Sequence, residues 1–184
     1  MTGKGKGVAL VTGAGERIGK ALAMATFQHG YAVAVHYHRS GEAAAALVAE
    51  IEAAGGRART FAADLSDESE SAGLVEAAAS LGPVTCLVNN ASAFEYDSAT
   101  SASRASWDAH MEVNLRAPLV LSQSFATALP DDRDGVIVNM LDQRVANLTP
   151  HFLSYTVSKS ALWTLTQTLA MALAPRIRVM GIGP

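Results

Sequence analysis

The side chains of Tyr155, Lys159 and Asp142 have the types and spacing of a proton-transfer site. On a helix, Tyr155 and Lys159 would be i, i+4 neighbours on one face. A free phenol has a pKa of about 10, and a nearby ammonium stabilises the phenolate. The pair therefore predicts a tyrosine pKa lowered toward neutrality. A Tyr and a Lys at this spacing are by themselves more often an ordinary helix face, but Asn114 and a glycine-rich turn favour the catalytic interpretation.

Asp142 precedes Tyr155 by thirteen residues and bears on the choice of substrate. Reduction of a carbonyl builds negative charge on oxygen, which a carboxylate at this place would oppose. A carboxylate suits a ring that carries N–H and NH₂ donors, such as a 2-amino-4-oxo-pteridine. It could also relay a proton, through Tyr155 or water, to a ring nitrogen. The alternative is that Asp142 only ends a strand and caps a loop.

A glycine-rich turn, Gly13 to Gly19, follows the first apolar run of the chain. Between a strand and a helix, such a turn brings backbone N–H groups close to a pyrophosphate, and the helix dipole adds to the attraction. Gly13 permits the tight turn and Gly19 the close packing of the helix. Arg17 begins that helix, where a positive charge is unfavourable. We therefore expect it to meet a cofactor phosphate or a substrate oxygen.

The segment from His36 to Ser40 ends the second apolar run and indicates the cofactor. An NAD site would place an acidic residue here for the ribose, and none precedes Glu42. Arg39 and Ser40 instead suit a 2′-phosphate, which predicts NADPH. The alternative is that Arg39 is a solvated loop charge. No Cys, Asp or Glu completes a metal set with His36 and His38, so no metal is expected.

Asp64 and Leu65 follow the third apolar run, and Phe94 follows the fourth. Asp64 either accepts a hydrogen bond from the adenine amino group, with Leu65 packed near that ring, or belongs to a helix N-cap region. Phe94 either packs in the core or stacks a flat heteroaromatic substrate against the nicotinamide.

The elements that must position these residues alternate along the chain. Strands are predicted at Gly7–Thr12, Ala32–Tyr37, Arg57–Ala63, Val84–Asn89, Gly135–Leu141 and Ile177–Gly181. Helices are predicted at Arg17–His29, Glu42–Ala54, Asp67–Ser80, Ser106–Leu129 and Phe152–Leu173. This order predicts a doubly wound parallel α/β sheet, a three-layer α/β/α Rossmann fold that forms one dinucleotide-binding domain over residues 1–184. The strands lack polar alternation, so we expect both sheet faces to be covered.

Composition limits the possible partners. The 184 residues carry a net charge of −3, which gives no electrostatic reason to expect nucleic acid or an anionic membrane. Apolar residues make up 49%, enough for a sizeable core. No apolar run reaches the roughly 18 residues of a membrane span, and no leader is expected at the N-terminus. The single cysteine, Cys86, is expected in the core rather than as a nucleophile, and a reducing cytoplasm is the expected setting.

The glycine turn, the segment Asn89-Asn90-Ala91-Ser92 and the Tyr155/Lys159 pair occur in the order typical of the short-chain dehydrogenase/reductase family, which the chain resembles over essentially its whole length. The resemblance implies that Tyr155 is the acid, that Lys159 binds the cofactor ribose and lowers the tyrosine pKa, and that Asn114 organises a proton relay. It also implies cofactor contacts at Ile18, His38, Asn90, Ala91, Ser92 and Pro184, besides those already named. In the family the two long helices pair across a two-fold axis, usually within a homotetramer. The family also continues past the last strand with a substrate-covering segment and one more strand, which we expect to be absent from this sequence.

Two departures from the family pattern narrow the function. Arg17 replaces the middle glycine of the turn, and Asp142 replaces a serine. Both are similar to the pteridine reductases and dihydromonapterin reductases, as are the segments His36–Ser40 and Asn90–Phe94. That branch implies substrate contacts at Arg17, Ser92, Phe94, Asp142 and Tyr155. The favoured function is NADPH-dependent reduction of a pterin or folate-like ring. The alternatives are an NADPH-dependent keto or acyl reductase and, against the Asn114, Tyr155 and Lys159 set, a non-catalytic nucleotide-binding scaffold.

Overall fold

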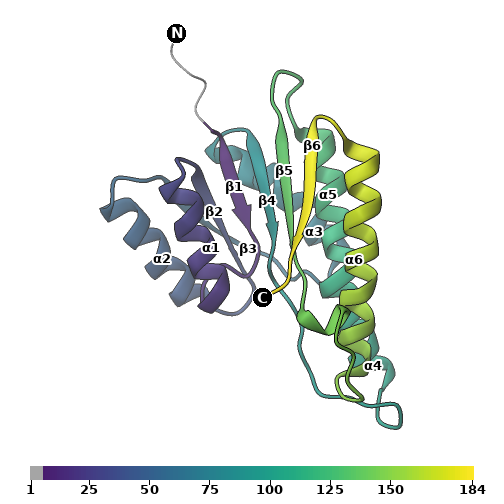
Figure 1. Cartoon of the computed structure of the whole chain (residues 1–184). Coiled ribbons are helices and arrows are strands. Elements are labelled where there is room, and N and C mark those ends of the chain that lie inside the picture. The colour runs from purple at the N-terminus through teal and green to yellow at the C-terminus, as the bar shows by residue number, and fades with distance from the viewer. Residues whose placement is uncertain (1–5) are drawn as a thin grey trace.

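Six parallel strands form one sheet in the computed structural model, which describes residues 6–184 (Figure 1). The strands are β1 (Val8–Val11), β2 (Ala32–Tyr37), β3 (Ala58–Ala62), β4 (Val84–Asn89), β5 (Gly135–Met140) and β6 (Ile177–Ile182). Their order in the sheet is β3-β2-β1-β4-β5-β6. From β1 the chain adds β2 and β3 toward one edge of the sheet, and then crosses over to add β4, β5 and β6 toward the other edge. Nucleotides bind in such sheets at this switch point between β1 and β4. The predicted Rossmann-type sheet is confirmed. Residues 1–5 belong to the N-terminal segment in which no leader was expected, and they lie outside the described residues.

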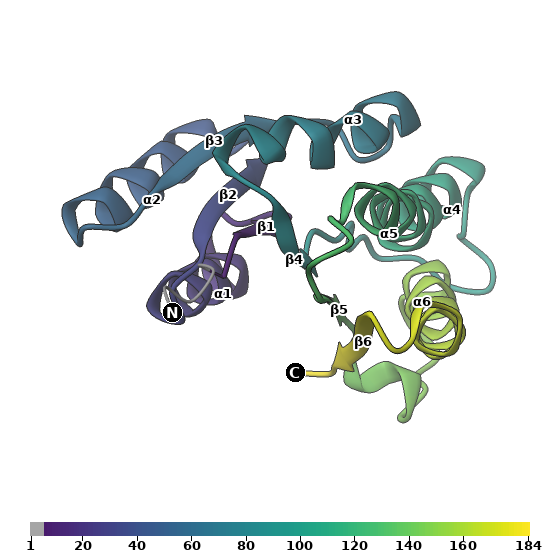
Figure 2. The same cartoon turned by 90° about the horizontal axis from the view of Figure 1, so that it is seen from above.

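Helices pack on both faces of the sheet (Figure 2). One face carries α1 (Arg17–Gln28) and α2 (Gly41–Ala53), and the other carries α3 (Glu68–Ala78), α5 (Ala117–Ala128) and α6 (Leu153–Leu173). Successive side chains of a strand point to opposite faces, so Leu10 packs in the core under α3 and α5, while Val11 packs in the core under α1 and α2. The predicted three layers follow from this division.

Coverage of the sheet is uneven. The central strands β1, β2 and β4 are buried almost throughout, whereas β5 alternates between buried and partly buried positions, and β3 and β6 are buried only at their first residue. The expectation that both faces would be covered is therefore correct for the central strands and wrong for the outer ones. The reason is that β3 and β6 are edge strands, and that α1 and α2 pack against β1, β2 and β3 rather than against β5 and β6.

The helix expected over Ser106–Leu129 is present as a continuous helical segment from Arg104 to Ala128, but it is not α-helical throughout. The structure divides this segment into α4 (Arg104–Met111), a π-helical turn (Glu112–Arg116) and α5. Pro118 has no N–H group to donate to the carbonyl of Asn114, four residues earlier, so the regular α-helical ladder is interrupted there. Such π-helical turns are frequent at functional sites, and this one contains Asn114.

Smaller differences occur at other helix ends. Asp67 is the N-cap of α3, because its side chain accepts hydrogen bonds from the N–H groups of Ser69 and Glu70. Asp64 lies three residues before this cap and does not form it. At the start of α6, Phe152 is the N-cap and has a left-handed backbone with φ 57° rather than a helical one. No helix within residues 6–184 is long and apolar enough to cross a membrane.

Candidate active site

A cleft of about 690 Å³ lies where the carboxyl ends of the strands meet their following loops, at the lower end of the sheet in Figure 1. Parallel strands place these ends at one edge, so loops far apart in the sequence come together there. Every predicted cofactor and substrate residue lines the cleft, whereas Asn114, predicted as a catalytic residue, does not. The predicted residues that line it are Gly13, Arg17, Ile18, Gly19, His38, Arg39, Ser40, Asp64, Leu65, Asn90, Ala91, Ser92, Phe94, Asp142, Tyr155, Lys159 and Pro184. The cleft is also lined by residues that were not predicted as cofactor or substrate contacts: Glu16, His36, Ala93, Val113, Met140 and Leu141.

The glycine turn between β1 and α1 has no room for larger residues. A Cβ atom at Gly19 would lie 2.0 Å from the carbonyl oxygen of Gly13. The amide of Asn90 donates to the carbonyls of Thr12 and Gly13, at 2.9 and 3.1 Å, which ties the turn to the end of β4. The N-cap residue Glu16 makes no side-chain hydrogen bond to the first turn of α1. The N–H groups of that turn are therefore free of a side-chain cap and suited to an anion.

Arg17 has a backbone conformation that favours glycine. Its φ is 49°, in the left-handed region where an L residue is strained by about 1–2 kcal/mol. The side chain is exposed and lines the cleft. This strain at a cleft residue is consistent with the expected contact to an anion or a substrate oxygen.

The sequence suggested only metal binding for His36, but in the structure its ring forms hydrogen bonds to two backbone groups. Its Nδ1 accepts the N–H of Gly13 at 3.0 Å, and its Nε2 lies 3.1 Å from the carbonyl oxygen of Ala63. Because a backbone amide only donates, Nδ1 is unprotonated and Nε2–H donates to Ala63. Burial lowers the pKa of His36 to about 4. The neutral ring thus joins the ends of β1 and β3 across β2, a contact that no sequence pattern signals.

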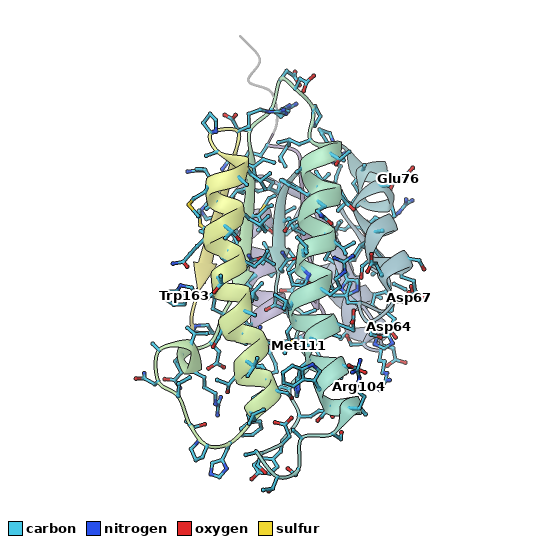
Figure 3. All side chains as sticks on the ribbon, turned by 90° about the vertical axis from the view of Figure 1, so that its right-hand side faces the viewer. Asp64, Asp67, Glu76, Arg104, Met111 and Trp163 are labelled. Atoms are coloured by element: carbon cyan, nitrogen blue, oxygen red, sulfur yellow. The ribbon has the colours of Figure 1, made fainter. Side chains whose placement is uncertain are left out.

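The ends of β2 and β3 place one group of polar side chains together. Arg39 is exposed and Ser40 half-buried, and both line the cleft. His38 Nε2 lies 3.6 Å from Asp64 Oδ2. Hydrogen bonds from the hydroxyl and N–H of Ser66 hold the pKa of Asp64 below its ordinary value. Asp64 therefore presents an ionised carboxylate beside Asp67, on the side of the molecule shown in Figure 3.

Asp142 and Tyr155 are joined directly. The Tyr155 hydroxyl donates to Asp142 Oδ2 at 2.9 Å. The other carboxylate oxygen, Oδ1, accepts the N–H of Arg144 at 2.8 Å and so caps the short 3₁₀ turn Gln143–Val145. Asp142 is thus both a loop cap and the hydrogen-bond partner of the tyrosine, so the two interpretations of this residue do not exclude each other.

The expected lowering of the tyrosine pKa is wrong for this arrangement of protein groups. Burial, and then the hydrogen bond to Asp142 and its negative charge, raise the pKa of Tyr155. Lys159 Nζ donates to the carbonyl of Met140 at 2.8 Å and lies 5.8 Å from the centre of the Tyr155 ring. Burial lowers the pKa of Lys159 to about 8. Tyr155 therefore stays protonated at neutral pH and holds its proton more tightly than a free phenol.

Asn114 is 1% exposed and holds the loop after β4. Its Oδ1 accepts from the N–H of Ala93 at 2.8 Å and from the hydroxyl of Ser92 at 3.1 Å. Its Nδ2 donates to the carbonyl of Ala93 at 3.0 Å and to the hydroxyl of Ser158, in α6, at 3.1 Å. These contacts position the cleft residues of the loop, and the role of Asn114 in a proton relay stays a prediction.

Phe94 is 52% exposed, which rules out simple core packing. Its ring stacks on Phe152 with centroids 4.5 Å apart and planes 8° from parallel. It also packs edge-on against the ring of Tyr155, at 4.7 Å and 78°. With one face covered and the side chain half-exposed, Phe94 offers a flat surface next to the Tyr155 ring.

Comparison with known proteins decides the family. A family model described as short chain dehydrogenase matches residues 7–184. The chain belongs to this family. Membership makes the chain an oxidoreductase. Three relatives of this short-chain dehydrogenase show which activities similar proteins have.

A crystal structure described as FolM alternative dihydrofolate reductase 1 from Brucella suis, in complex with NADP, is 47% identical with a TM-score of 0.92 and covers 97% of this chain and 74% of that one. Pteridine reductase 1 from Leishmania tarentolae is 34% identical, with 96% of this chain and 75% of that protein covered. The 3-oxoacyl-acyl-carrier-protein reductase FabG from Staphylococcus aureus is 32% identical, with 96% and 72% covered. This short-chain dehydrogenase is thus similar both to a pteridine reductase and an alternative dihydrofolate reductase and to a 3-oxoacyl reductase.

Proposed function

We propose that this chain is an NADPH-dependent reductase of a pteridine ring, such as a dihydropterin, a biopterin or a folate-like compound. The observation that carries the proposal is the Asp142 carboxylate, 2.9 Å from the Tyr155 hydroxyl. A carboxylate beside the proton donor repels the oxyanion that forms when a ketone is reduced. It attracts a ring with N–H and NH₂ donors, so it favours a 2-amino-4-oxo-pteridine over a ketone.

The residues of the cleft fit NADPH. Arg39 and Ser40 offer a guanidinium and a hydroxyl for the 2′-phosphate, with no acidic residue at the end of β2 to favour a free ribose. The uncapped first turn of α1 and the crowded Gly13–Gly19 approach suit the diphosphate. The similarity to a FolM structure in complex with NADP supports this cofactor. When bound, NADPH supplies the hydride.

The chain's own residues supply the proton and hold the ring. In the proposed reaction one C=N bond is reduced: the hydride adds to carbon, and a proton passes from the Tyr155–Asp142 pair to nitrogen. Tyr155 is protonated at neutral pH, and its hydroxyl is hydrogen-bonded to Asp142 at 2.9 Å, so the pair holds one proton next to the cleft. The half-exposed ring of Phe94 would stack on the pteridine beside that hydroxyl.

A parallel assay of 7,8-dihydropterin and a simple ketone, followed by NADPH absorbance, tests the proposal. We expect turnover of the pterin, and turnover of ketones alone would overturn the assignment. The variant Asp142→Asn keeps the size of the side chain but removes the proton-carrying group, so pterin turnover should fall by about 10²–10⁴-fold. Binding of NADPH should barely change. Asp142→Ser should depress pterin reduction and introduce weak ketone reduction, and near-normal pterin turnover in Asp142→Asn would show that Asp142 is only a loop cap.

A keto or acyl reductase with the same cofactor is the second candidate. It is favoured by the 32% identity to a 3-oxoacyl reductase over 96% of this chain. It is opposed by the position of Asp142. The same pair of substrates separates the two candidates.

We further propose a cytoplasmic homotetramer in which α4, α5 and α6 form a subunit interface. The apolar side chains of Trp107 on α4 and of Val157 and Trp163 on α6 are 38%, 40% and 43% exposed, and Figure 3 faces these helices. Exposed apolar side chains on neighbouring helices are a feature of protein–protein contact surfaces. The single cysteine of the chain, Cys86, is buried in β4 with a free thiol, which fits a reducing compartment.

A further inference from the structure

A buried cluster of polar side chains lies behind Tyr155. Asp97 comes from the loop after β4, His110 from α4 and Ser154 from the first turn of α6, and their exposed fractions are 1%, 0% and 0%. The Ser154 hydroxyl donates to Asp97 Oδ2 and lies 2.6 Å from His110 Nδ1. None of the three lines the cleft, so the proposed cofactor and substrate contacts do not account for them.

The backbone N–H of Glu95 at one end of the cluster and the Asp97 carboxylate at the other fix the direction of these hydrogen bonds. The N–H of Glu95 donates to His110 Nε2 at 3.0 Å, and a backbone amide can only donate, so Nε2 is unprotonated. The neutral ring then carries its proton on Nδ1 and donates it to Ser154, whose own hydroxyl donates to Asp97. All three bonds therefore run in one direction and end on a carboxylate, an arrangement in which neighbouring bonds strengthen one another.

Asp97 also holds the beginning of α6. Its backbone carbonyl accepts the N–H of Phe152 at 2.8 Å, and its Oδ1 accepts the N–H of Ser154 at 3.1 Å. Phe152, the N-cap residue, provides no side-chain cap of its own, so a carboxylate from a distant segment takes that place. Burial opposes ionisation of Asp97, but the hydrogen bonds from Ser154 and Ser106 outweigh it, and its pKa lies below the ordinary value.

The cluster touches both parts of the proposed proton-transfer site. Phe152, held in a left-handed conformation by its bond to Asp97, stacks on Phe94. The His110 ring packs edge-on against the Tyr155 ring, with centroids 5.9 Å apart. We propose that Asp97, Ser154 and His110 are positioning residues that set the place of the Tyr155 hydroxyl against Asp142 and the orientation of the Phe94 ring. This inference rests on the proposed role of Tyr155 as proton donor.

Paired substitutions at His110 test the role of the cluster. Gln can copy both bonds of the histidine, because its carbonyl oxygen accepts from Glu95 and its NH₂ donates to Ser154. Leu has similar bulk and can do neither. We expect His110→Leu to lower kcat by about ten- to a hundredfold through misplacement of the reacting groups, with the KM for NADPH unchanged, and His110→Gln to restore most of kcat. The control is Ser122→Ala, which removes a buried hydroxyl bonded to the Pro118 carbonyl in α5, away from the site.

Asp97→Asn is the second variant and keeps the test decisive if His110→Leu fails to fold. Its amide would donate to Ser154 and so reverse the direction of the bonds. His110 would then need its proton on Nε2, against the N–H of Glu95. We expect the same loss of kcat as for His110→Leu, and equal kcat in Asp97→Asn and the wild-type protein would overturn the proposal.

A spectroscopic readout separates this inference from the proposed function. The carbon-13 signal of the Tyr155 Cζ atom, assigned with Tyr155→Phe, should shift when Asp142→Asn changes the hydrogen bond to the phenol. In the His110→Leu background this response should be largely lost, while His110→Gln and Ser122→Ala should retain it. A response of wild-type size in His110→Leu would overturn the positioning role. Loss of the response together with no pterin turnover by any of the proteins would uphold the positioning role and reject the proposed function.

Discussion

The stability of the fold should depend on pH through His36. In the folded chain its pKa is lowered from the ordinary 6.5 to about 4, because the ring is buried. The ring is also bonded on both nitrogens, and protonation of Nδ1 would set it against the N–H of Gly13. The unfolded chain therefore binds a proton more readily than the folded one between pH 6.5 and about 4. Stability must then fall as the pH is lowered through this interval.

The size of the effect follows from the difference between the two pKa values. One pKa unit corresponds to about 1.36 kcal/mol, so a lowering from 6.5 to about 4 contributes about 3 kcal/mol to the free energy of unfolding, present above pH 6.5 and lost by about pH 4. That is a substantial part of the roughly 5–15 kcal/mol of a typical domain. Carboxylates with lowered pKa values, such as Asp67 and Asp97, add their own loss at the acidic end.

Urea unfolding followed by circular dichroism at a series of pH values isolates the contribution of one residue. The difference in free energy of unfolding between wild type and His36→Gln should change by about 3 kcal/mol across the interval. His29→Gln, which removes an exposed histidine from the end of α1, is the matched control. A wild-type minus His36→Gln difference that stays constant with pH would refute the reasoning, since it would mean that His36 titrates alike in both states.

Three further predictions concern the cofactor site and the assembly. Arg39→Ala should raise the KM for NADPH by the equivalent of about 1.5–3 kcal/mol, the value of a hydrogen bond to a charged group, and an unchanged NADPH/NADH preference would remove Arg39 from the phosphate site. Arg17→Gly should relieve the left-handed strain and raise the free energy of unfolding by up to about 1 kcal/mol, while weakening binding of cofactor or substrate; equal or lower stability in chemical denaturation would contradict the strain argument. Light scattering at micromolar concentration should show an oligomer larger than a monomer, and a monomer would rule out the helix interface proposed around Trp107 and Trp163.

The order of the elements was predictable because strands and helices differ in pattern and length. Mainly apolar runs gave the central strands: the prediction for β1 was one residue too long at each end, and that for β4, Val84–Asn89, had the correct bounds. The residues that line the cleft were also accessible from sequence, since in a parallel sheet they follow the ends of strands. The division of the helix around Asn114 had a signal, Pro118, which the expectation of one long helix overlooked.

Features that depend on three-dimensional burial were not predictable. The pKa of Tyr155 is raised because its ring is buried and because Asp142, thirteen residues earlier in the chain, accepts a hydrogen bond from its hydroxyl. Local spacing suggested only the influence of Lys159. Likewise, Asp97 and His110 are ordinary residues in sequence, and their significance comes from the approach of Ser154 across 57 and 44 positions of the chain.

The π-helical turn at Glu112–Arg116 separates α4, which contacts the site, from α5, which packs against the sheet. A regular helix advances by 3.6 residues per turn, so its faces keep a constant relation along the whole length, and a change at one end constrains what can pack at the other. The extra backbone in this turn breaks that relation. α5 can keep Leu121 and Phe125 in the sheet core while α4 turns His110 toward α6 and the loop of Phe94. Residues that shape the substrate end of the molecule can therefore vary without disturbing the packing that holds the sheet together.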